Sequence, residues 1–253
     1  MRGLDGKNVI VTGGGGAIGA AICRRFAGYG ARVGVFDKNV EGARKLAAEI
    51  KGFASGGDIT DYDAVGKEIA RFEKECGPTD VLVNNAGWDK FVNFVDTTPD
   101  LWEQVIAINL RGPLNMSHFV LKGMVARKRG AIVNVGSTAG LVGDYMLPVY
   151  SAMKGAVHSF TKVLANEVAT HNILVNAICV GRIDSEQWRR FHSQSGSALS
   201  YEDYLAEQGR AIPLGRMGRP DEFASLLSLL ASEAGGYITG TAINVDGGLS
   251  PAV

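Results

Sequence analysis

The chain has 253 residues, of which 46% are hydrophobic and 21% charged, a composition typical of a globular protein with a substantial buried core. Its 26 basic and 26 acidic side chains cancel, so it has no broad positive field that would attract nucleic acid or an anionic membrane. Its 34 glycines exceed the usual share of about 7%, which indicates a specific use of glycine.

Cysteine usage is consistent with a reducing compartment, and hydropathy predicts no membrane segment. Cys23, Cys76 and Cys179 are odd in number and far apart, which predicts neither a disulfide framework nor a zinc site. The four histidines are scattered without metal-ligand spacing. The N-terminus lacks a secretory signal pattern, and no run of about 18 apolar residues occurs. We therefore expect a soluble, cytoplasmic protein without a metal site, a nucleic-acid partner or a membrane partner.

Short apolar runs alternate with helical patterns from the start of the chain. Residues 8–12 predict a strand, and the spacing of apolar residues over 17–30 predicts an amphipathic helix. A second strand is predicted over 31–36 and a second helix over 40–50. Residues 52–57 are expected to form a short connection.

The alternation continues in the second half of the chain. Further strands are predicted over 80–83, 131–135 and 173–179, with helical patterns over 100–125, 149–170 and 221–231. Fully apolar strands separated by helices predict a parallel sheet covered on both faces. We therefore expect a single α/β domain spanning residues 1–253, built as three α/β/α layers.

The segment 182–212 is the one irregular stretch. It contains a helical piece around Trp188 and a second one over 201–210, joined by a link rich in serine and glycine. A segment of this length between a strand and the next helix is typical of an active-site lid. We predict a substrate lid here.

A glycine-rich loop, residues 12–19, follows the first predicted strand and opens the first helix. Glycines let the backbone approach a pyrophosphate, and the free amides and dipole of a helix N-terminus favour its negative charge. Asp37 ends the second strand, where a carboxylate can bind the adenosine ribose hydroxyls and repel a 2′-phosphate. The pattern favours NAD over NADP. The adjacent Lys38 weakens this preference, and a merely flexible loop is the alternative.

Ser137, Tyr150 and Lys154 bring together a hydroxyl, a phenol and an amine. Tyr150 and Lys154 are spaced i,i+4, which on a helix puts them on one face about 5–6 Å apart at Cβ. A nearby cation favours the phenolate and can lower the pKa of a tyrosine by roughly 1–3 units. The group predicts a proton-transferring centre, although the pair read alone also fits an ordinary exposed helix pair.

The motifs can be read as one set along the chain. The set comprises Thr12-Gly13 with Ala17-Ile18-Gly19, Asp58, Asn84-Asn85-Ala86-Gly87, Asn109, Ser137, Tyr150-x-x-x-Lys154, Pro213-Leu214-Gly215-Arg216, Gly240-Thr241 and Asp246-Gly247-Gly248. Together these residues resemble the short-chain dehydrogenase/reductase family from end to end. The resemblance implies a Rossmann-type fold, NAD bound at the C-terminal ends of the strands, and an oxidoreductase that interconverts a secondary alcohol and a ketone.

The resemblance also implies which residues bind the cofactor. Gly13, Gly16, Ile18 and Gly19 are expected at the pyrophosphate, Asp37 at the ribose, and Asp58 with Ile59 at the adenine. Asn85, Ala86 and Gly87 are expected along the cofactor, with Tyr150, Lys154, Gly181, Ile183 and Ser185 toward the nicotinamide. Two positions depart from the family pattern: Ala17 replaces a glycine, and Val180-Gly181 replaces a Pro-Gly pair.

The catalytic roles follow from the same resemblance. Tyr150 is expected to act as the general base in oxidation and the general acid in reduction. Lys154 is expected to bind the nicotinamide ribose and acidify Tyr150, while Ser137 holds the substrate oxygen. Asn109 matches the position that supports a water-linked proton path, and its alternative is an asparagine bonded locally within a helix.

The substrate is the least determined feature. Trp88, Tyr145 and Trp188 are expected to contact it together with Ser137 and Tyr150. Asn85-Ala86-Gly87-Trp88-Asp89 followed by Phe91, together with the stretch 211–216, resembles a subgroup that includes alicyclic hydroxyacyl-coenzyme A dehydrogenases. This resemblance suggests a hydrophobic alcohol or ketone, including one carried as a thioester. Arginines at 182, 189, 190 and 210 either meet an anionic group of the substrate or form a solvated mixed-charge face.

Alternative functions remain open at this point. One is an NAD-binding regulatory or scaffolding protein without turnover, although such a protein has no need of a proton relay. Another is an NADPH-dependent 3-oxoacyl reductase. An isomerase or dehydratase that uses transient hydride transfer is disfavoured by the chain length. Because family members are usually dimers or tetramers, we expect a homo-oligomer, with contacts supplied by the helices over 100–125 and 149–170.

Overall fold

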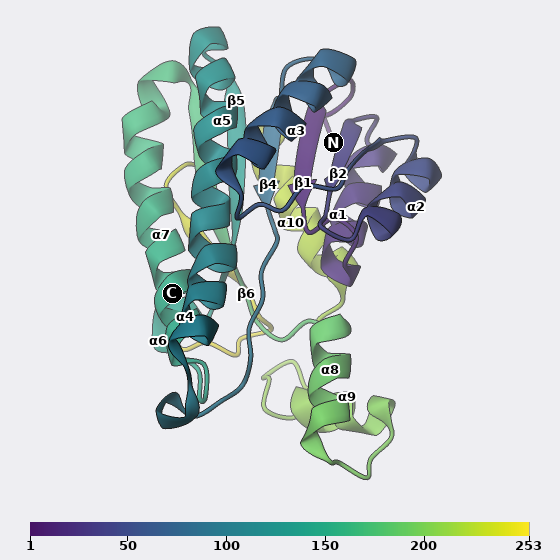
Figure 1. Cartoon of the computed structure of the whole chain (residues 1–253), viewed down its shortest axis with the longest axis vertical. Helices are drawn as coiled ribbons and strands as arrows, with labels where there is room; N and C mark the ends of the chain where they lie inside the picture. Colours follow the sequence, from purple (N-terminus) through teal and green to yellow (C-terminus); the bar gives the residue numbers. More distant parts are fainter. Residues whose placement is uncertain (253) are drawn as a thin grey trace.

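The computed structural model describes residues 1–252, and its centre is a seven-stranded parallel sheet (Figure 1). The strands are β1 (Asn8–Thr12), β2 (Arg32–Phe36), β3 (Phe53–Ser55), β4 (Val81–Asn84), β5 (Gly130–Ser137), β6 (Ile173–Val180) and β7 (Ala242–Val245). Their order is β3-β2-β1-β4-β5-β6-β7, with every pairing parallel. The chain winds outward from β1 to β3 and then the other way from β4 to β7. This confirms the doubly wound, Rossmann-type sheet.

Helices cover both faces of the sheet. On one face lie α1 (Ala17–Gly28), α2 (Val40–Ile50) and α10 (Pro220–Leu230); on the other lie α3 (Tyr62–Cys76), α5 (Gly112–Arg127) and α7 (Pro148–Val168). The remaining helices are α4 (Pro99–Ile106), α6 (Ala139–Val142), α8 (Glu186–Ser195), α9 (Tyr201–Gly209), the π-helical turn η2 (Ala107–Arg111), and the 3-10 turns η1 (Phe94–Asp96), η3 (Ala169–His171) and η4 (Glu233–Gly235). Among the helices of residues 1–252, none combines the length and the apolar character needed to cross a membrane.

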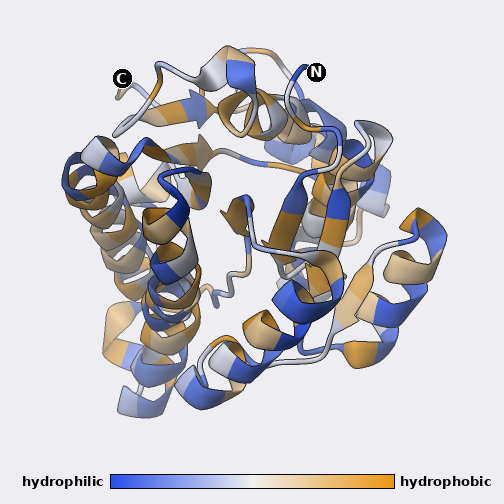
Figure 2. Cartoon of the chain, turned by 90° about the horizontal axis from the view of Figure 1, so that it is seen from above, coloured by the Kyte–Doolittle hydropathy of each residue, from blue (hydrophilic) through white to orange (hydrophobic). Residues whose placement is uncertain are grey.

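The central strands feed two separate cores because successive side chains point to opposite faces of a sheet. In β1, Val9 and Val11 belong to the core beneath α1, whereas Ile10 belongs to the core beneath α3 and α5. All three side chains are fully buried, which explains why this strand is an uninterrupted apolar run. Seen from above, apolar strands lie inside a ring of helices whose residues alternate in hydropathy (Figure 2).

Two strands of the sheet and one of the long helices that cover it, β3, β7 and α3, were not predicted from the sequence. β3 lies within 52–57, the segment expected to be only a connection, and it is too short to display a pattern. α3 carries a helical signal in Val65, Ile69 and Phe72, and its N-cap Asp61 accepts a hydrogen bond from the Ala64 amide. β7 lies at the sheet edge, where its partly exposed residues give no continuous apolar run.

The predicted helix over 100–125 is interrupted. Its backbone widens into the π-helical turn η2 between α4 and α5, and Asn109 lies in this turn. Such turns inside helices are frequent at functional sites. The segment 182–212 contains α8 and α9, which project beyond the C-terminal ends of the strands (Figure 1).

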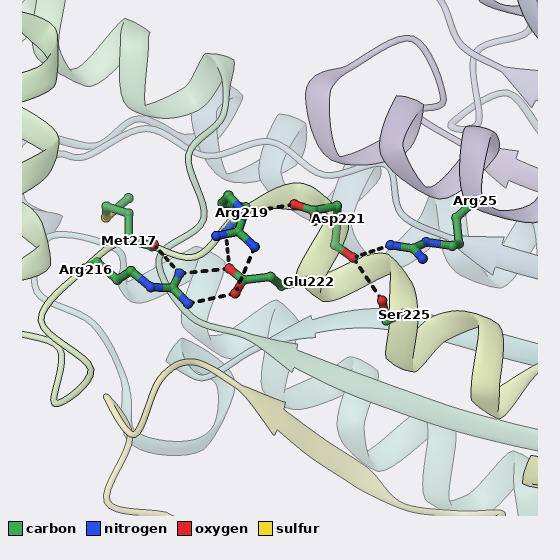
Figure 3. Close-up of polar contacts among 7 residues, drawn as sticks. All are labelled: Arg25, Arg216, Met217, Arg219, Asp221, Glu222 and Ser225. Atoms are coloured by element: carbon green, nitrogen blue, oxygen red, sulfur yellow. Dashed lines mark hydrogen bonds and ion pairs between the residues drawn. The ribbon is translucent and has the colours of Figure 1, made fainter.

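A network of charged residues fixes the chain where it returns from this projecting segment to α10 (Figure 3). The Arg216 guanidinium donates two hydrogen bonds to the Glu222 carboxylate, at 2.9 and 2.7 Å. Glu222 also accepts a hydrogen bond from the Arg219 amide at 2.9 Å, which satisfies a free donor at the start of α10. Arg25 of α1 donates to the Asp221 carbonyl at 3.3 Å. The base of α10 is therefore tied both to the preceding loop and to α1.

Candidate active site

A cavity of about 640 Å³ opens at the C-terminal ends of the strands. It collects residues from the ends of β1, β2, β4, β5 and β6 and from α7 and α8. The predicted residues that line it are Gly13, Gly16, Ile18, Gly19, Asp37, Asp58, Ile59, Asn85, Ala86, Gly87, Trp88, Ser137, Tyr150, Lys154, Gly181, Ile183, Ser185 and Trp188. The topology thus gathers side chains that are scattered along the whole sequence into one place.

The glycine loop supplies a close-fitting wall at the start of α1. Gly13 has φ +63°, a left-handed conformation, and a Cβ there would lie 2.9 Å from Ala86 Cα. A Cβ on Gly19 would lie 2.1 Å from the Gly13 carbonyl oxygen, so the first helical turn packs directly on the loop. Gly16 is the N-cap and makes no side-chain cap, which leaves the first amides of a 12-residue helix directed at the cavity.

This wall fits the pyrophosphate of a dinucleotide. The uncapped amides and the positive end of the helix dipole favour two negative phosphates, and the backbone is bare enough for close approach. Asp37 and Asp58 lie on the β2 and β3 side of this wall, and Tyr150 and Lys154 on the β5 side. A dinucleotide laid over the edge of the sheet would therefore meet acidic groups at one end and Tyr150 with Lys154 at the other.

Asp37 lies immediately after β2, where its carboxylate faces the glycine loop. Its Oδ2 accepts a hydrogen bond from the Gly15 amide at 2.9 Å, and its Oδ1 accepts one from the Asn39 amide at 2.8 Å. These bonds hold the carboxylate at the rim of the cavity. Asp58 is fixed similarly, because its Oδ1 accepts from both the amide and the hydroxyl of Thr60 at 2.9 Å.

Thr12 joins the two halves of the sheet beneath the cofactor wall. Its hydroxyl oxygen accepts hydrogen bonds from the amides of Asn85 and Ala86, both at 3.0 Å. The Asn85 side chain donates in return to the carbonyls of Thr12 and Gly13, at 2.9 and 3.2 Å. From the sequence, Thr12 was only part of a motif, whereas in the structure it makes a specific bridging contact between β1 and the end of β4.

Tyr150, Lys154 and Ser137 converge as the spacing predicted. Lys154 is buried, and its Nζ lies 5.5 Å from the centre of the Tyr150 ring. The same Nζ donates a hydrogen bond to the Val135 carbonyl at 2.8 Å, which anchors it to β5. Ser137, at the end of β5, is also buried, and its Oγ accepts a hydrogen bond from the Ala139 amide at 3.1 Å. The alternative of an exposed helix pair is therefore wrong.

The protonation of this group differs from the expectation. Burial raises the pKa of Tyr150, the charge of Asp89 adds to the effect, and the Ser137 hydroxyl acts in the opposite direction. Burial also lowers the pKa of Lys154 to about 8, despite the nearby charges of Asp89 and Cys179. Desolvation therefore dominates the pKa of Tyr150, and Lys154 is not among the groups that lower it.

Asn109 lies behind the cavity and is fully buried. Its Nδ2 donates to the carbonyls of Trp88 at 2.7 Å and Val105 at 2.9 Å, and its Oδ1 accepts from the Trp88 amide at 3.3 Å. It therefore makes the local bond within the helix that was the alternative to a role in a proton path. In addition, it fixes the loop that carries Trp88. A Cβ on Gly87 would lie 3.1 Å from the Asn109 Oδ1 and 3.6 Å from the Lys154 Nζ, so this glycine permits the close packing.

The far end of the cavity is formed by aromatic side chains. Phe91 and Phe191 contact each other edge to face with ring centres 4.4 Å apart, and Trp188 packs against Phe191 at 5.6 Å. Trp88 and Trp188, which we expect to contact the substrate, both line the cavity. Tyr145, by contrast, is 79% exposed and lies outside the cavity lining.

Asp89 is a cavity residue to which the sequence gave no predicted role. It is 2% exposed, lines the cavity, and faces α8. Burial raises the pKa of Asp89 to about 6, while the charges of Arg190 and Lys154 oppose this rise. Its position directly after Trp88 was its only signal, since the partners that surround it lie far along the chain.

The arginines of the projecting segment have separate partners. Arg190 is paired with Asp89, with Nη2 and Oδ1 3.4 Å apart. Arg182 donates to Gln208 at 3.2 Å and lies over the Trp188 ring. Arg189 pairs with Glu186 on its own helix at 3.7 Å. The predicted mixed-charge face thus describes Arg189, whereas Arg182 contacts another residue of the segment and Arg190 joins the segment to Asp89.

The chain is similar to known proteins over most of its length. The short chain dehydrogenase family matches residues 7–196. The acetoacetyl-CoA reductase of Shinella zoogloeoides is 40% identical over 240 residues, which cover 94% of this chain and 96% of the relative.

Two solved structures share the whole fold. The 3-ketoacyl-(acyl-carrier-protein) reductase from Brucella melitensis, complexed with NADH, superposes with a TM-score of 0.90 at 30% identity, covering 98% of this chain and 99% of that one. A single-residue variant of actinorhodin polyketide ketoreductase, with NADPH, gives 0.93 at 32% identity, covering 99% of this chain and 100% of that one. These similar proteins bind nicotinamide cofactors of both kinds.

Proposed function

The chain belongs to the short chain dehydrogenase family of oxidoreductases that act on hydroxyl and keto groups, and we propose that it interconverts a hydrophobic secondary alcohol and its ketone with NAD. The observation that carries the proposal is the convergence of Ser137, Tyr150 and Lys154 on one cavity, beside an uncapped helix N-terminus. A protein that only bound a dinucleotide would need the helix terminus but not the buried proton-transferring group.

In oxidation, the substrate hydroxyl binds between Ser137 and Tyr150. Tyr150 removes the hydroxyl proton as the C–O bond gains double-bond character, and Ser137 donates a hydrogen bond to the oxygen as its charge develops. A bound nicotinamide would accept the hydride that leaves the carbon bearing the hydroxyl group. Tyr150 therefore enters oxidation as the phenolate, and the balance is one proton to its oxygen and one hydride to the cofactor. Reduction runs through the same groups in reverse, with the neutral phenol as the proton donor.

Lys154 supports this transfer in two ways. We propose that it binds the nicotinamide ribose and that, with its charge held near the ring, it favours the phenolate of Tyr150, whose pKa burial raises. Asn109 holds the Trp88 segment in place from behind. We propose that it also supports a water-linked path by which the proton of Tyr150 reaches solvent.

Asp37 supports NAD as the preferred cofactor. Two backbone amides hold its carboxylate at the rim of the cavity, where a 2′-phosphate would meet a fixed negative charge. The exposed Lys38 beside it is the feature that favours the second candidate, an NADPH-dependent 3-oxoacyl reductase. The substrate named for the 40% identical acetoacetyl-CoA reductase, a 3-oxoacyl thioester, supports the same candidate.

The substrate class is inferred from the aromatic end of the cavity. Trp88, Trp188 and Phe191 offer apolar surface next to Ser137 and Tyr150, which suits an alicyclic or hydrocarbon group attached to the reacting carbon. A cavity open to solvent also admits a substrate whose remainder extends outward, such as a hydroxyacyl thioester. We infer a hydrophobic alcohol of this kind rather than a polyol.

The homo-oligomer expected from the sequence is part of the same proposal. Leu114 on α5 and Val163 on α7 are apolar side chains with 38% and 62% exposure, so both helices present apolar surface to a neighbouring subunit. We propose a dimer or tetramer that uses these helices, and sedimentation at micromolar concentration measures its size.

The testing experiment follows NADH or NADPH formation by absorbance with cyclic alcohols, sugar alcohols, 3-hydroxy acids and hydroxyacyl thioesters. We expect turnover with a hydrophobic alcohol or thioester, faster with NAD than with NADP. Tyr150→Phe should lose at least about 100-fold in kcat while it still binds NADH, because general acid-base catalysis contributes about that much. Full activity of that variant would disprove the mechanism, and equal rates with both cofactors would disprove the role of Asp37.

A further inference from the structure

The side chain of Asp89 lies between the reacting end of the cavity and the projecting helix α8. Its Oδ2 accepts a hydrogen bond from Gln187 Nε2. Arg190 Nη2 lies 3.4 Å from both the Oδ1 and the backbone carbonyl oxygen of Asp89. Two side chains one turn apart on α8 therefore reach a single residue on the opposite wall of the cavity.

These are the polar contacts by which α8 reaches the rest of the protein. Within residues 1–252, the other polar side-chain contacts of this helix stay inside the segment 182–218. The lid's remaining ties, Tyr201 to Asp184 at 2.6 Å and Arg182 to Gln208 at 3.2 Å, also lie within that segment. Beyond Asp89, α8 meets the opposite wall through the contact of Phe191 with Phe91.

The charges around Asp89 determine which cation pairs with its buried carboxylate. The groups that face it are Arg190 from α8, Lys154 and Tyr150 from α7, and Asp144 from the loop after α6. Within residues 1–252 Lys154 forms no ion pair with Asp89, whereas the Arg190 guanidinium lies 3.4 Å from Asp89 Oδ1, so Arg190 is the cation that pairs with the buried carboxylate. A buried carboxylate needs such a partner, and here the partner is delivered only when α8 lies across the cavity.

We propose that Asp89 is a positioning residue that holds α8 closed over the substrate end of the cavity, through Gln187 and Arg190. Arg190 then serves the lid and does not bind an anionic group of the substrate. The contact sets how tightly the substrate is retained, and this kinetic consequence rests on the proposed function. The closure itself does not, so it can be measured without any substrate.

The first test measures hydrogen exchange of backbone amides by mass spectrometry on the full chain without ligands. Asp89→Asn and Arg190→Gln should each raise the exchange rate of residues 186–195 several-fold, with no change in β1 or β4. Arg189→Gln is the matched control, since it removes the same charge from the same helix but pairs only with Glu186 and the lid's own Tyr201. Unchanged exchange over α8 in both test variants would overturn the proposal.

The second test is a kinetic double-mutant cycle on the best substrate found. Each single variant should raise the KM for the alcohol about tenfold with a smaller change in kcat, and the double variant should be no worse than either single one, because both remove the same contact. If Arg190 instead binds the substrate, Arg190→Gln alone raises KM and Asp89→Asn does not. If no alcohol is turned over, the proposed function fails while the exchange result still decides the lid. If Asp89→Asn does not fold, Arg190→Gln provides the same comparison from the exposed side of the pair.

Discussion

Lys154 is a buried amine whose positive charge is opposed by its surroundings. It is 4% exposed, and burial lowers its pKa to about 8 from the usual value of 10.5. The charge is nonetheless what the proposed mechanism uses, both to bind a ribose and to favour the phenolate of Tyr150. A residue kept at a cost to folding in this way is typical of catalytic groups.

Replacing this amine should change how stability depends on pH. Because the pKa of Lys154 is lower in the folded state, the unfolded chain binds more protons between about pH 8 and pH 10.5, so this group adds stability as the pH rises. We expect the free energy of unfolding of the wild type to gain up to roughly 3 kcal/mol relative to Lys154→Met across that window. Denaturant titrations of both proteins without nucleotide measure it, and parallel curves would refute the shift.

At the scale of elements, the N-termini of α1 and α10 differ in how their backbone amides are satisfied. The N-terminus of α1 has no side-chain cap and leaves its amides for a ligand, whereas the N-terminus of α10 is closed by Glu222. Glu222 in turn receives both arms of the Arg216 guanidinium. The difference indicates that the N-terminus of α10 anchors the end of the lid segment, while the N-terminus of α1 keeps its amides available for a ligand.

Removing the charge of Glu222 should loosen this anchor. Its bonds to Arg216 and to the Arg219 amide lower the pKa of Glu222 to about 2, so its contribution is present above its usual value of 4.5 and is lost as the pH falls toward 2. Glu222→Gln should cost about 1 kcal/mol of stability at pH 7, and the difference from wild type should shrink toward pH 2. Urea titrations at several pH values measure this. Asp221→Asn is the control, because Asp221 makes no bidentate pair with an arginine, and this variant should lose clearly less free energy of unfolding.

For the molecule as a whole, the sequence predicted the layers well and the contacts between distant segments poorly. Strands such as β1 are buried on both faces, so their apolar runs are visible without a structure. The pairing of Asp89 with Arg190 joins residues 101 positions apart through charges that look like any others in the sequence. The burial that sets the pKa of Lys154, and the outward direction of Tyr145, likewise arise only when the elements pack.

The whole cavity wall is built from both halves of the sheet, so a bound dinucleotide should stabilise the entire fold. A ligand that binds only the folded state at about 100 times its Kd adds about 2.7 kcal/mol, which corresponds to several degrees in Tm for a chain of this size. We expect NADH to raise the Tm of the wild type and of Tyr150→Phe equally, because the removed hydroxyl acts in proton transfer. NADPH should raise it less, since its 2′-phosphate meets Asp37, and Asp37→Asn should bring the two shifts together. Thermal unfolding followed by scanning calorimetry measures all three proteins without any substrate, and a larger shift with NADPH in the wild type would contradict the placement of the ribose at Asp37.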